Sequence, residues 1–69
     1  MNQITINANG KEMEMEKNAT LADLLVQLNM KPMGIAAELN GTLVSSTDFG
    51  DTMLQNGDEL LLVKMVGGG

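Results

Sequence analysis

Hydrophobic and polar residues alternate along the first part of the chain in a pattern that predicts a β-hairpin. Ile4 and Ile6 are flanked by polar residues, which is the two-residue period of a strand with one buried face. The pair Asn9-Gly10 follows and predicts a tight turn, because both residues tolerate a positive φ angle. Beyond the turn, Met13 and Met15 alternate with glutamates. We expect a returning strand with its methionines in the core and its glutamates in water.

The period then changes to that of a helix. Thr20 is a residue type that caps helix N-termini, and Asp23 is placed to interact with the positive end of the helix dipole. Asn29 and Pro32 are typical of a helix end, so the segment predicts an amphipathic helix of roughly three turns. Its apolar face consists of residues at i, i+3, i+4 and i+7, namely Leu21, Leu24, Leu25 and Leu28.

A second hairpin is predicted after the helix. Residues 35–39 are mostly apolar, Asn40-Gly41 is a strong hairpin-turn pair, and residues 42–44 form a short return. The polar stretch over residues 45–51 predicts a turn-rich loop with one helical turn. This loop contains Phe49, the only aromatic residue, which we expect to fill the core.

The last apolar segment, residues 59–66, follows a turn over residues 56–58. A strand that is apolar on both faces belongs in the middle of a sheet and is covered on at least one side, so we expect this strand to be central. One helix between two hairpins covers one face of a mixed sheet of about four or five strands. The sequence therefore predicts an α+β fold, with one domain over residues 1–66 and a flexible tail over residues 67–69.

Composition narrows the possible functions. The chain has 69 residues, a formal net charge of −5, and neither cysteine nor histidine. A chain of this length supports one compact core rather than a core and a deep catalytic cleft. The missing residue types exclude a thiol nucleophile, a zinc–thiolate site and a histidine base. We expect no catalytic site, no metal site and no cofactor bound by the chain itself.

Charge and hydropathy indicate where the protein works and what it contacts. Phosphate backbones repel an acidic chain, so no nucleic-acid binding is expected, and a basic protein surface is the natural complement. The alternative is that the acidic charge only keeps a small protein soluble. No apolar stretch approaches the about 20 residues that span a bilayer, and the first residues lack the pattern of a secretory signal. We expect a cytoplasmic protein with no membrane association, monomeric when free.

The closing glycines are the candidate for chemistry. Gly67 and Gly68 neither pack nor stabilise a strand, and three glycines extend a chain by roughly 10 Å as a thread narrow enough to enter another protein. The Gly69 carboxylate is ionised at neutral pH and is a poor electrophile. Conversion to a mixed anhydride with a nucleotide would activate it, and attack by a sulfur nucleophile would leave a thiocarboxylate. The alternative is a frayed end or a cloning remnant.

Other features have structural explanations beside functional ones. Met65 and Val66 precede the tail and form a possible docking patch, or else they complete the core. The methionines lack the clustered spacing of a thioether metal site. Three glutamates alternate along the second strand, namely Glu12, Glu14 and Glu16. The solvated face of an edge strand explains them better than a pair of catalytic carboxylates does.

Several short signals together resemble the ThiS family of sulfur carriers in thiamine biosynthesis. In chain order they are Asn9-Gly10, the helix start over Ala19–Leu25, Asn40-Gly41, Gly57-Asp58 and the closing Val66–Gly69. The resemblance covers the whole chain and implies a β-grasp (ubiquitin-like) fold, which agrees with the element order predicted above.

The resemblance also implies a mechanism and a set of partners. An E1-like, ThiF-like adenylyltransferase would use ATP and magnesium to activate Gly69. A sulfurtransferase or cysteine desulfurase would supply sulfur, and the thiocarboxylate would deliver it to a ThiG-like thiazole synthase. Gly67 and Gly68 would be the part of the tail that the partners recognise.

The sequence departs from the family pattern in one region and is compatible with three further functions. The loop over residues 45–49 lacks the basic residue that many members carry, and Phe49 stands where a tryptophan is frequent. The small subunit of molybdopterin synthase shares the Gly-Gly terminus and the same chemistry. A ubiquitin-like protein modifier would have the same kind of tail, and a plain interaction module could carry a tail without a function.

Overall fold

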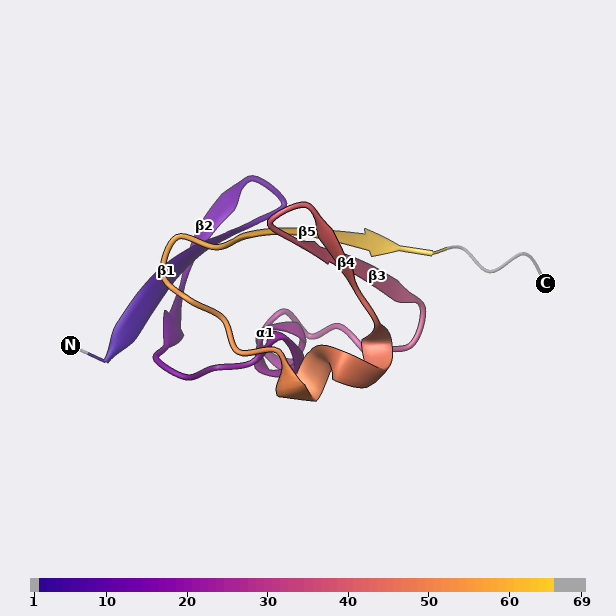
Figure 1. Cartoon of the computed structure of the whole chain (residues 1–69), viewed down its shortest axis with the longest axis horizontal. Helices are drawn as coiled ribbons and strands as arrows, with labels where there is room; N and C mark the ends of the chain where they lie inside the picture. Colours follow the sequence, from indigo (N-terminus) through magenta and orange to yellow (C-terminus); the bar gives the residue numbers. More distant parts are fainter. Residues whose placement is uncertain (1, 66–69) are drawn as a thin grey trace.

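A five-stranded mixed sheet is the frame of the molecule in the computed structural model, which describes residues 2–65. The strand order is β2-β1-β5-β3-β4, with β5 parallel to β1 and antiparallel to β3 (Figure 1). The predicted α+β class and the central place of the last strand are confirmed. The elements in chain order are β1 (Gln3–Ala8), β2 (Lys11–Glu16), α1 (Leu21–Gln27), β3 (Ile35–Leu39), β4 (Thr42–Val44), the 3-10 helix η1 (Ser46–Asp51) and β5 (Glu59–Lys64).

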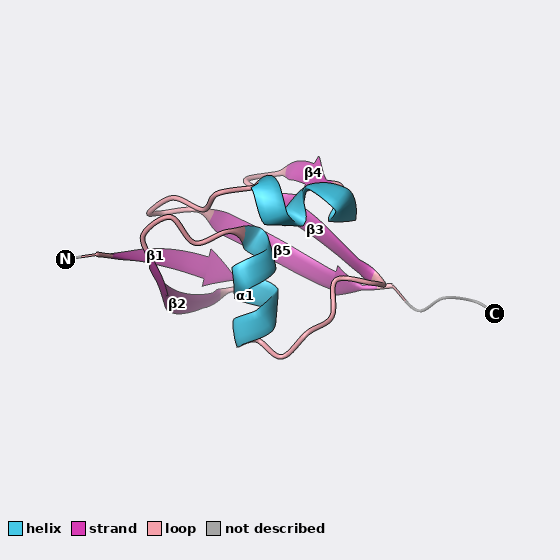
Figure 2. Cartoon of the chain, turned by 90° about the horizontal axis from the view of Figure 1, so that it is seen from below, coloured by secondary structure: helices cyan, strands magenta, loops and turns pink. Residues whose placement is uncertain are grey.

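Both helices lie on the same side of the sheet. Figure 2 views the molecule from that side and shows α1 and η1 in front of the strands. Phe49 of η1 is 2% exposed, and Met15 is buried while Met13 packs partly buried against the core, as predicted. The core between the two layers consists of Ile6, Ala8, Met15, Ala19, Leu21, Leu24, Leu25, Ile35, Ala37, Phe49, Leu54, Leu60 and Leu62.

The start of α1 is a capping box. The Thr20 hydroxyl accepts a hydrogen bond from the Asp23 N–H at 3.2 Å, and the Asp23 carboxylate accepts one from the Thr20 N–H at 2.9 Å. Two N–H groups that the helix itself leaves without partners are thereby satisfied. The predicted N-terminus of the helix is confirmed.

Asn29 ends α1, as predicted, but the helix is shorter than predicted. The helix has seven residues, about two turns rather than three. Asn29 takes a φ of 59° and donates its N–H to the Val26 carbonyl, and Met30 donates to the Leu25 carbonyl. This pair of bonds is a Schellman motif, which ends a helix where one residue adopts the left-handed conformation. The backbone of Asn29 therefore stops the helix before Pro32 is reached.

The two hairpins share one turn chemistry. Asn9 and Gly10 have φ angles of 55° and 83°, and Asn40 and Gly41 have φ angles of 52° and 86°. Positive φ at both central residues defines the type I′ turn, whose twist matches that of the flanking strands. Both predicted turns are confirmed.

Asn9 has a second role, because its side chain holds the central strand. Strand β1 pairs with β5 only as far as Ala8 opposite Leu60. Beyond that point the Asn9 Oδ1 accepts the N–H of Leu62 at 2.7 Å, and its Nδ2 donates to the Leu62 carbonyl at 3.1 Å. The side chain thus takes the place of the next step in the parallel ladder, after the backbone of β1 has turned away.

Asn40 holds β5 from the other side. Its N–H donates to the Glu59 carbonyl at 2.8 Å, and its Oδ1 accepts the Glu59 N–H at 2.9 Å. Its Nδ2 also donates to the Asp58 carboxylate at 3.0 Å, just before the strand begins. The asparagine of each hairpin turn is therefore hydrogen-bonded to the same strand, β5.

Residues 2–65 share one hydrophobic core, and no helix within them is long and apolar enough to cross a bilayer. The predicted boundary between residues 66 and 67 lies outside the described residues.

We predict that the Asn9 side chain contributes measurably to stability. Asn9→Gly keeps the positive φ but removes both hydrogen bonds to Leu62, so the free energy of unfolding should fall by about 1–3 kcal/mol. The matched control is Asn18→Gly, since Asn18 is exposed, has a φ of 74° and has no hydrogen-bonded side chain within residues 2–65. Urea unfolding of both variants measures the difference. Equal losses would contradict this role of the side chain.

Candidate functional site

The predicted reactive tail, Gly67–Gly69, lies outside the described residues, as does Val66. The structure does show where the tail starts. Met65 follows β5 and donates its N–H to the Gly34 carbonyl at 2.7 Å, which extends the ladder between β3 and β5 by one residue. The described chain therefore ends directly after the central strand, at the end of the molecule away from the start of β1 (Figure 1).

Met65 is exposed rather than part of the core. Its exposed fraction is 62%. The alternative that Met65 completes the core is therefore wrong. The chain at this point lies at the sheet surface, next to Gly34 in the loop before β3.

The side of the sheet away from the helices is uncovered by any element within residues 2–65 (Figures 1 and 2). We call it the open face. Alternation along the strands decides which side chains it carries, because Leu60 and Leu62 point into the core and their neighbours point the other way. Its strand positions are Gln3, Thr5, Asn7, Glu12, Glu14, Glu16, Ala36, Glu38, Leu43, Glu59, Leu61 and Val63.

A row of apolar side chains crosses the open face and runs to the tail. Leu61 and Val63 are 48% and 47% exposed, and Met65 continues the same alternation beyond the end of β5. Leu43 of β4, which pairs with the same Glu38 as Leu61, is 70% exposed beside them. We call Leu61, Val63 and Met65 the apolar strip. Contiguous exposed apolar surface on a small protein is typical of a docking site.

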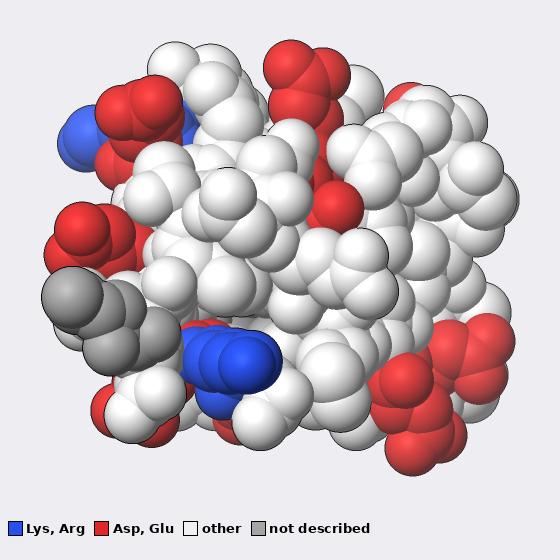
Figure 3. All heavy atoms as spheres, turned by 60° about the vertical axis from the view of Figure 1, so that its left-hand side comes forward, with Lys and Arg blue, Asp and Glu red and all other residues white. Residues whose placement is uncertain are grey.

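The charged positions of the open face are all acidic. Figure 3 shows one side of the molecule, where acidic side chains gather at several places and basic ones at few. Lys11 pairs with inward-facing Ala8, and Lys64 follows the inward-facing Leu62 by two residues, so both lie on the helix side of their strands. The charged residues of the open face are Glu12, Glu14, Glu16, Glu38 and Glu59.

The three glutamates of β2 are exposed on an edge strand, in agreement with the solvated face that was predicted for them. Within residues 2–65, the histidine, cysteine and carboxylate side chains form no group of three or more that could hold a metal ion.

Comparison with known proteins identifies the family. The model of the ThiS family matches residues 2–69. The chain belongs to the ThiS family. A crystal structure of the thiamine biosynthesis protein ThiS from Geobacter metallireducens has a TM-score of 0.80 at 25% identity, over 96% of this chain and 100% of that one. The β-grasp fold expected of the family is thereby confirmed.

Two relatives in sequence extend the comparison. The sulfur carrier protein ThiS of Escherichia coli is 30% identical over 61 residues, which is 88% of this chain and 92% of that protein. A thiazole synthase of Magnetococcus marinus is 36% identical over 64 residues, which is 93% of this chain but 20% of the relative. The chain thus spans about a fifth of that second protein's length.

The two departures from the family pattern differ in their exposure to solvent. Phe49 is buried, so a phenylalanine where a tryptophan is frequent changes core packing and not a surface that partners meet. Residues 45–48 are exposed, so the missing basic residue does alter the surface.

The sequence predicts a possible docking role for Met65 but does not by itself distinguish Leu61 and Val63 from the core residues beside them. All three belong to a continuous apolar run, and such a run does not tell which residues point outward. A usable signal was present in Glu59, because a charged residue at the start of the strand marks the solvent side and places every second residue with it.

Two adjacent leucines of β5 provide a test of the open face. Leu62→Ala should lower the free energy of unfolding by about 2–5 kcal/mol, because it leaves a cavity in the core. Leu61→Ala removes the same atoms from the exposed side of the strand and should lower the free energy of unfolding by less than about 1 kcal/mol. Urea unfolding at two protein concentrations measures both changes. A large, concentration-dependent cost for Leu61→Ala would mean that another copy of the chain covers this face.

Proposed function

We propose that Gly69 carries sulfur as a C-terminal thiocarboxylate in thiamine biosynthesis. The chain is a sulfur carrier by its family membership and by its similarity to the sulfur carrier ThiS over nearly all of both sequences. The observation that supports Gly69 as the working group is that the family match extends through this residue. The apolar strip, which runs along β5 toward the tail, is consistent with it.

The proposed chemistry takes place at the terminal carboxyl group in two steps. A carboxylate oxygen of Gly69 attacks the α-phosphate of ATP, pyrophosphate leaves, and an acyl-adenylate forms. A sulfur nucleophile at the oxidation level of sulfide then attacks the carbonyl carbon, and AMP leaves with the bonding electron pair. The product is a thiocarboxylate. The chain has no cysteine, so a side-chain thiol cannot be the sulfur carrier here.

The catalytic groups for both steps are assigned to the partners. We propose an E1-like adenylyltransferase that holds ATP and magnesium, and a sulfurtransferase or cysteine desulfurase that supplies sulfur as an enzyme-bound persulfide. A thiol reductant provides the two electrons that release this sulfur at the oxidation level of sulfide, and the reductant is itself oxidised to a disulfide. Gly67 and Gly68, which lack side chains, form the narrow link that enters the partner's active site. The carrier's own contribution is to present this link at the end of a strand that hydrogen bonds hold on both sides.

Thiazole synthase is the proposed acceptor of the sulfur. A segment similar to 93% of this chain occurs within a thiazole synthase, which supports a partnership between the two functions. The names of the family and of these relatives favour the thiamine pathway over the molybdopterin pathway.

Removal of Gly69 tests the proposal. The variant still ends in a glycine carboxylate, that of Gly68, but its tail is shorter by about 3.5 Å. Because misplacement of a reacting group by about 1 Å already costs about 100-fold in rate, ATP–pyrophosphate exchange with the adenylyltransferase should fall by at least this factor. Urea unfolding of the same variant should match the full chain. Exchange at the rate of the full chain would contradict the assignment of Gly69.

A protein modifier would give different products. A modifier forms isopeptide bonds with target lysines, so a tagged chain incubated with ATP and cell extract would give a ladder of high-mass species on a denaturing gel. A sulfur carrier should give the free chain alone. A ladder that disappears when Gly69 is removed would contradict the carrier proposal.

A further inference from the structure

Three asparagines are each followed by a glycine, and this pair of residues is prone to spontaneous deamidation. The glycine nitrogen attacks the side-chain amide carbon of the asparagine, ammonia leaves, and a cyclic succinimide forms. Water then opens the ring to aspartate or isoaspartate, so the net change is the gain of water and the loss of ammonia. Glycine favours the attack because it has no Cβ to hinder the approach. The pairs are Asn9-Gly10, Asn40-Gly41 and Asn56-Gly57.

The reaction needs a free glycine nitrogen and an asparagine side chain that is free to turn toward it. The third pair meets neither condition. The Gly57 N–H donates to the Thr5 carbonyl at 2.8 Å, and the Asn56 Oδ1 accepts the Thr5 N–H at 2.8 Å. Both reacting groups are thus hydrogen-bonded to β1, and Asn56 is protected.

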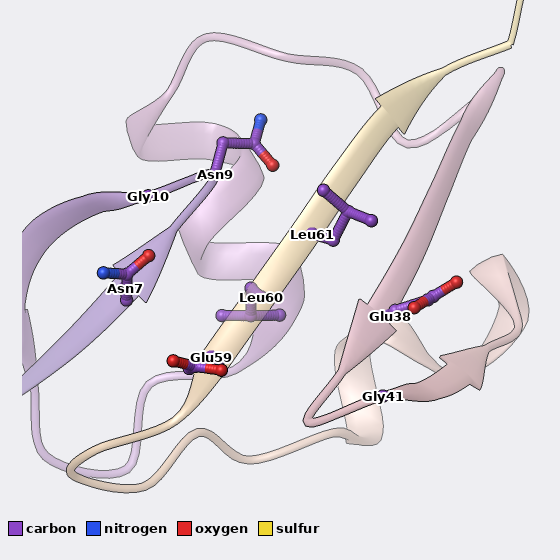
Figure 4. A pocket seen from close by; sticks show the side chains of 8 residues that line it. All are labelled: Asn7, Asn9, Gly10, Glu38, Gly41, Glu59, Leu60 and Leu61. Carbon is purple, nitrogen blue, oxygen red and sulfur yellow. The ribbon is translucent and has the colours of Figure 1, made fainter.

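The glycines of the two hairpin turns are open to water. Figure 4 shows Gly10 and Gly41 on either side of β5, and both line a hollow of about 540 Å³ on the open face. Neither glycine donates its N–H to a hydrogen bond within residues 2–65. The attacking nitrogen is therefore available at both turns, and the hydrogen bonds of the asparagine side chain decide whether the reaction starts.

The side chain of Asn40 is held less firmly than that of Asn9. Both bonds of the Asn9 amide go to Leu62 and are partly buried. The bonds of Asn40 are exposed, since its Nδ2 donates to the Asp58 carboxylate at 3.0 Å and its Oδ1 accepts the Glu59 N–H at 2.9 Å. A hydrogen bond is stronger where water is excluded, so the exposed bonds open more often. The turn at Asn40 also leads into β4, an edge strand of three residues, and such a short element opens readily.

Deamidation of Asn40 replaces an attraction by a repulsion. Aspartate has an oxygen in place of Nδ2, so a new carboxylate would lie 3.0 Å from that of Asp58 if nothing moved. Like charges at such a distance repel. Isoaspartate instead lengthens the backbone of the turn by one carbon, which is incompatible with a type I′ hairpin. Either product weakens the hold on Glu59, the first residue of β5.

We propose that Asn40 is the site at which the folded chain deamidates, and that the reaction loosens the start of β5. The bond to Asp58 controls the rate, because it has to break before the amide turns toward Gly41. The Asn9 side chain still holds the strand at Leu62, so the modified chain remains folded but is less stable. The chain thus acquires an irreversible mark of its age on its central strand.

The first test compares the three sites in the full chain. The chain is incubated in mildly alkaline buffer, and peptide mapping by mass spectrometry follows the conversion of each amide to an acid. Asn40 should convert at least about threefold faster than Asn9 and Asn56, which corresponds to one hydrogen bond. In guanidinium chloride the three rates should become similar, because no side chain is held there. Equal rates in the folded chain, or a faster rate at Asn9 or Asn56, would overturn the assignment.

The second test removes the carboxylate that holds the Asn40 amide. Asp58→Ala should accelerate conversion at Asn40 about 10-fold or more, because a hydrogen bond to a charged group is lost. Conversion at Asn9 in the same variant should stay unchanged, which shows that β5 as a whole has not opened. The matched control, Asp51→Ala, removes the same charge from η1 and should change neither rate. No acceleration at Asn40, or equal acceleration at Asn9, would overturn the role of the bond to Asp58.

The third test measures the effect of the modification on the strand. Anion-exchange chromatography separates the deamidated chain, which has one more negative charge. Its urea unfolding midpoint should lie below that of the unmodified chain, and Asn40→Asp should reproduce the shift. An unchanged midpoint for both would overturn the loosening of β5.

Discussion

The hydrogen bonds from Asn9 and Asn40 to β5 are the constraint on which the rest of the structure depends. Each asparagine forms the left-handed corner of a type I′ turn, and its side chain then completes a ladder with the central strand. Strand β5 is held in register on both sides as a result. That register decides which residues enter the core, which face outward, and in which direction the chain continues toward the tail.

The fold separates recognition from chemistry. The helix side of β5 buries Leu60 and Leu62, while the open face presents the apolar strip beside acidic positions. Nothing in the composition offers a histidine or a cysteine for catalysis. In the proposed mechanism the sheet therefore supplies the docking surface, the terminal glycine supplies the reacting carboxylate, and the enzyme supplies the catalytic groups.

Local sequence patterns were enough to predict most of the fold. Alternation, the Asn-Gly pairs and the capping residues Thr20 and Asp23 identified both hairpins, the helix start and the central strand. Asn29 also identified the end of the helix, but the predicted length of three turns was wrong, because the seven residues from Leu21 to Gln27 make only about two turns. The bond from Asn9 to Leu62 joins residues 53 positions apart, so no local pattern contains it. Leu61 and Val63 were missed for a different reason: the strand is apolar on both faces, and only the charge of Glu59 marks which of its residues point outward.

The most direct test of the central claim is the mass of the C-terminal fragment of the protein produced together with its partner enzymes. We expect the fragment containing Gly69 to be heavier by the difference between sulfur and oxygen, and we expect a thiol-alkylating reagent to label it. Because the chain lacks cysteine, such a label has no competing thiol. An unmodified fragment, isolated while the adenylyltransferase and the sulfur supply are shown to be active, would contradict it.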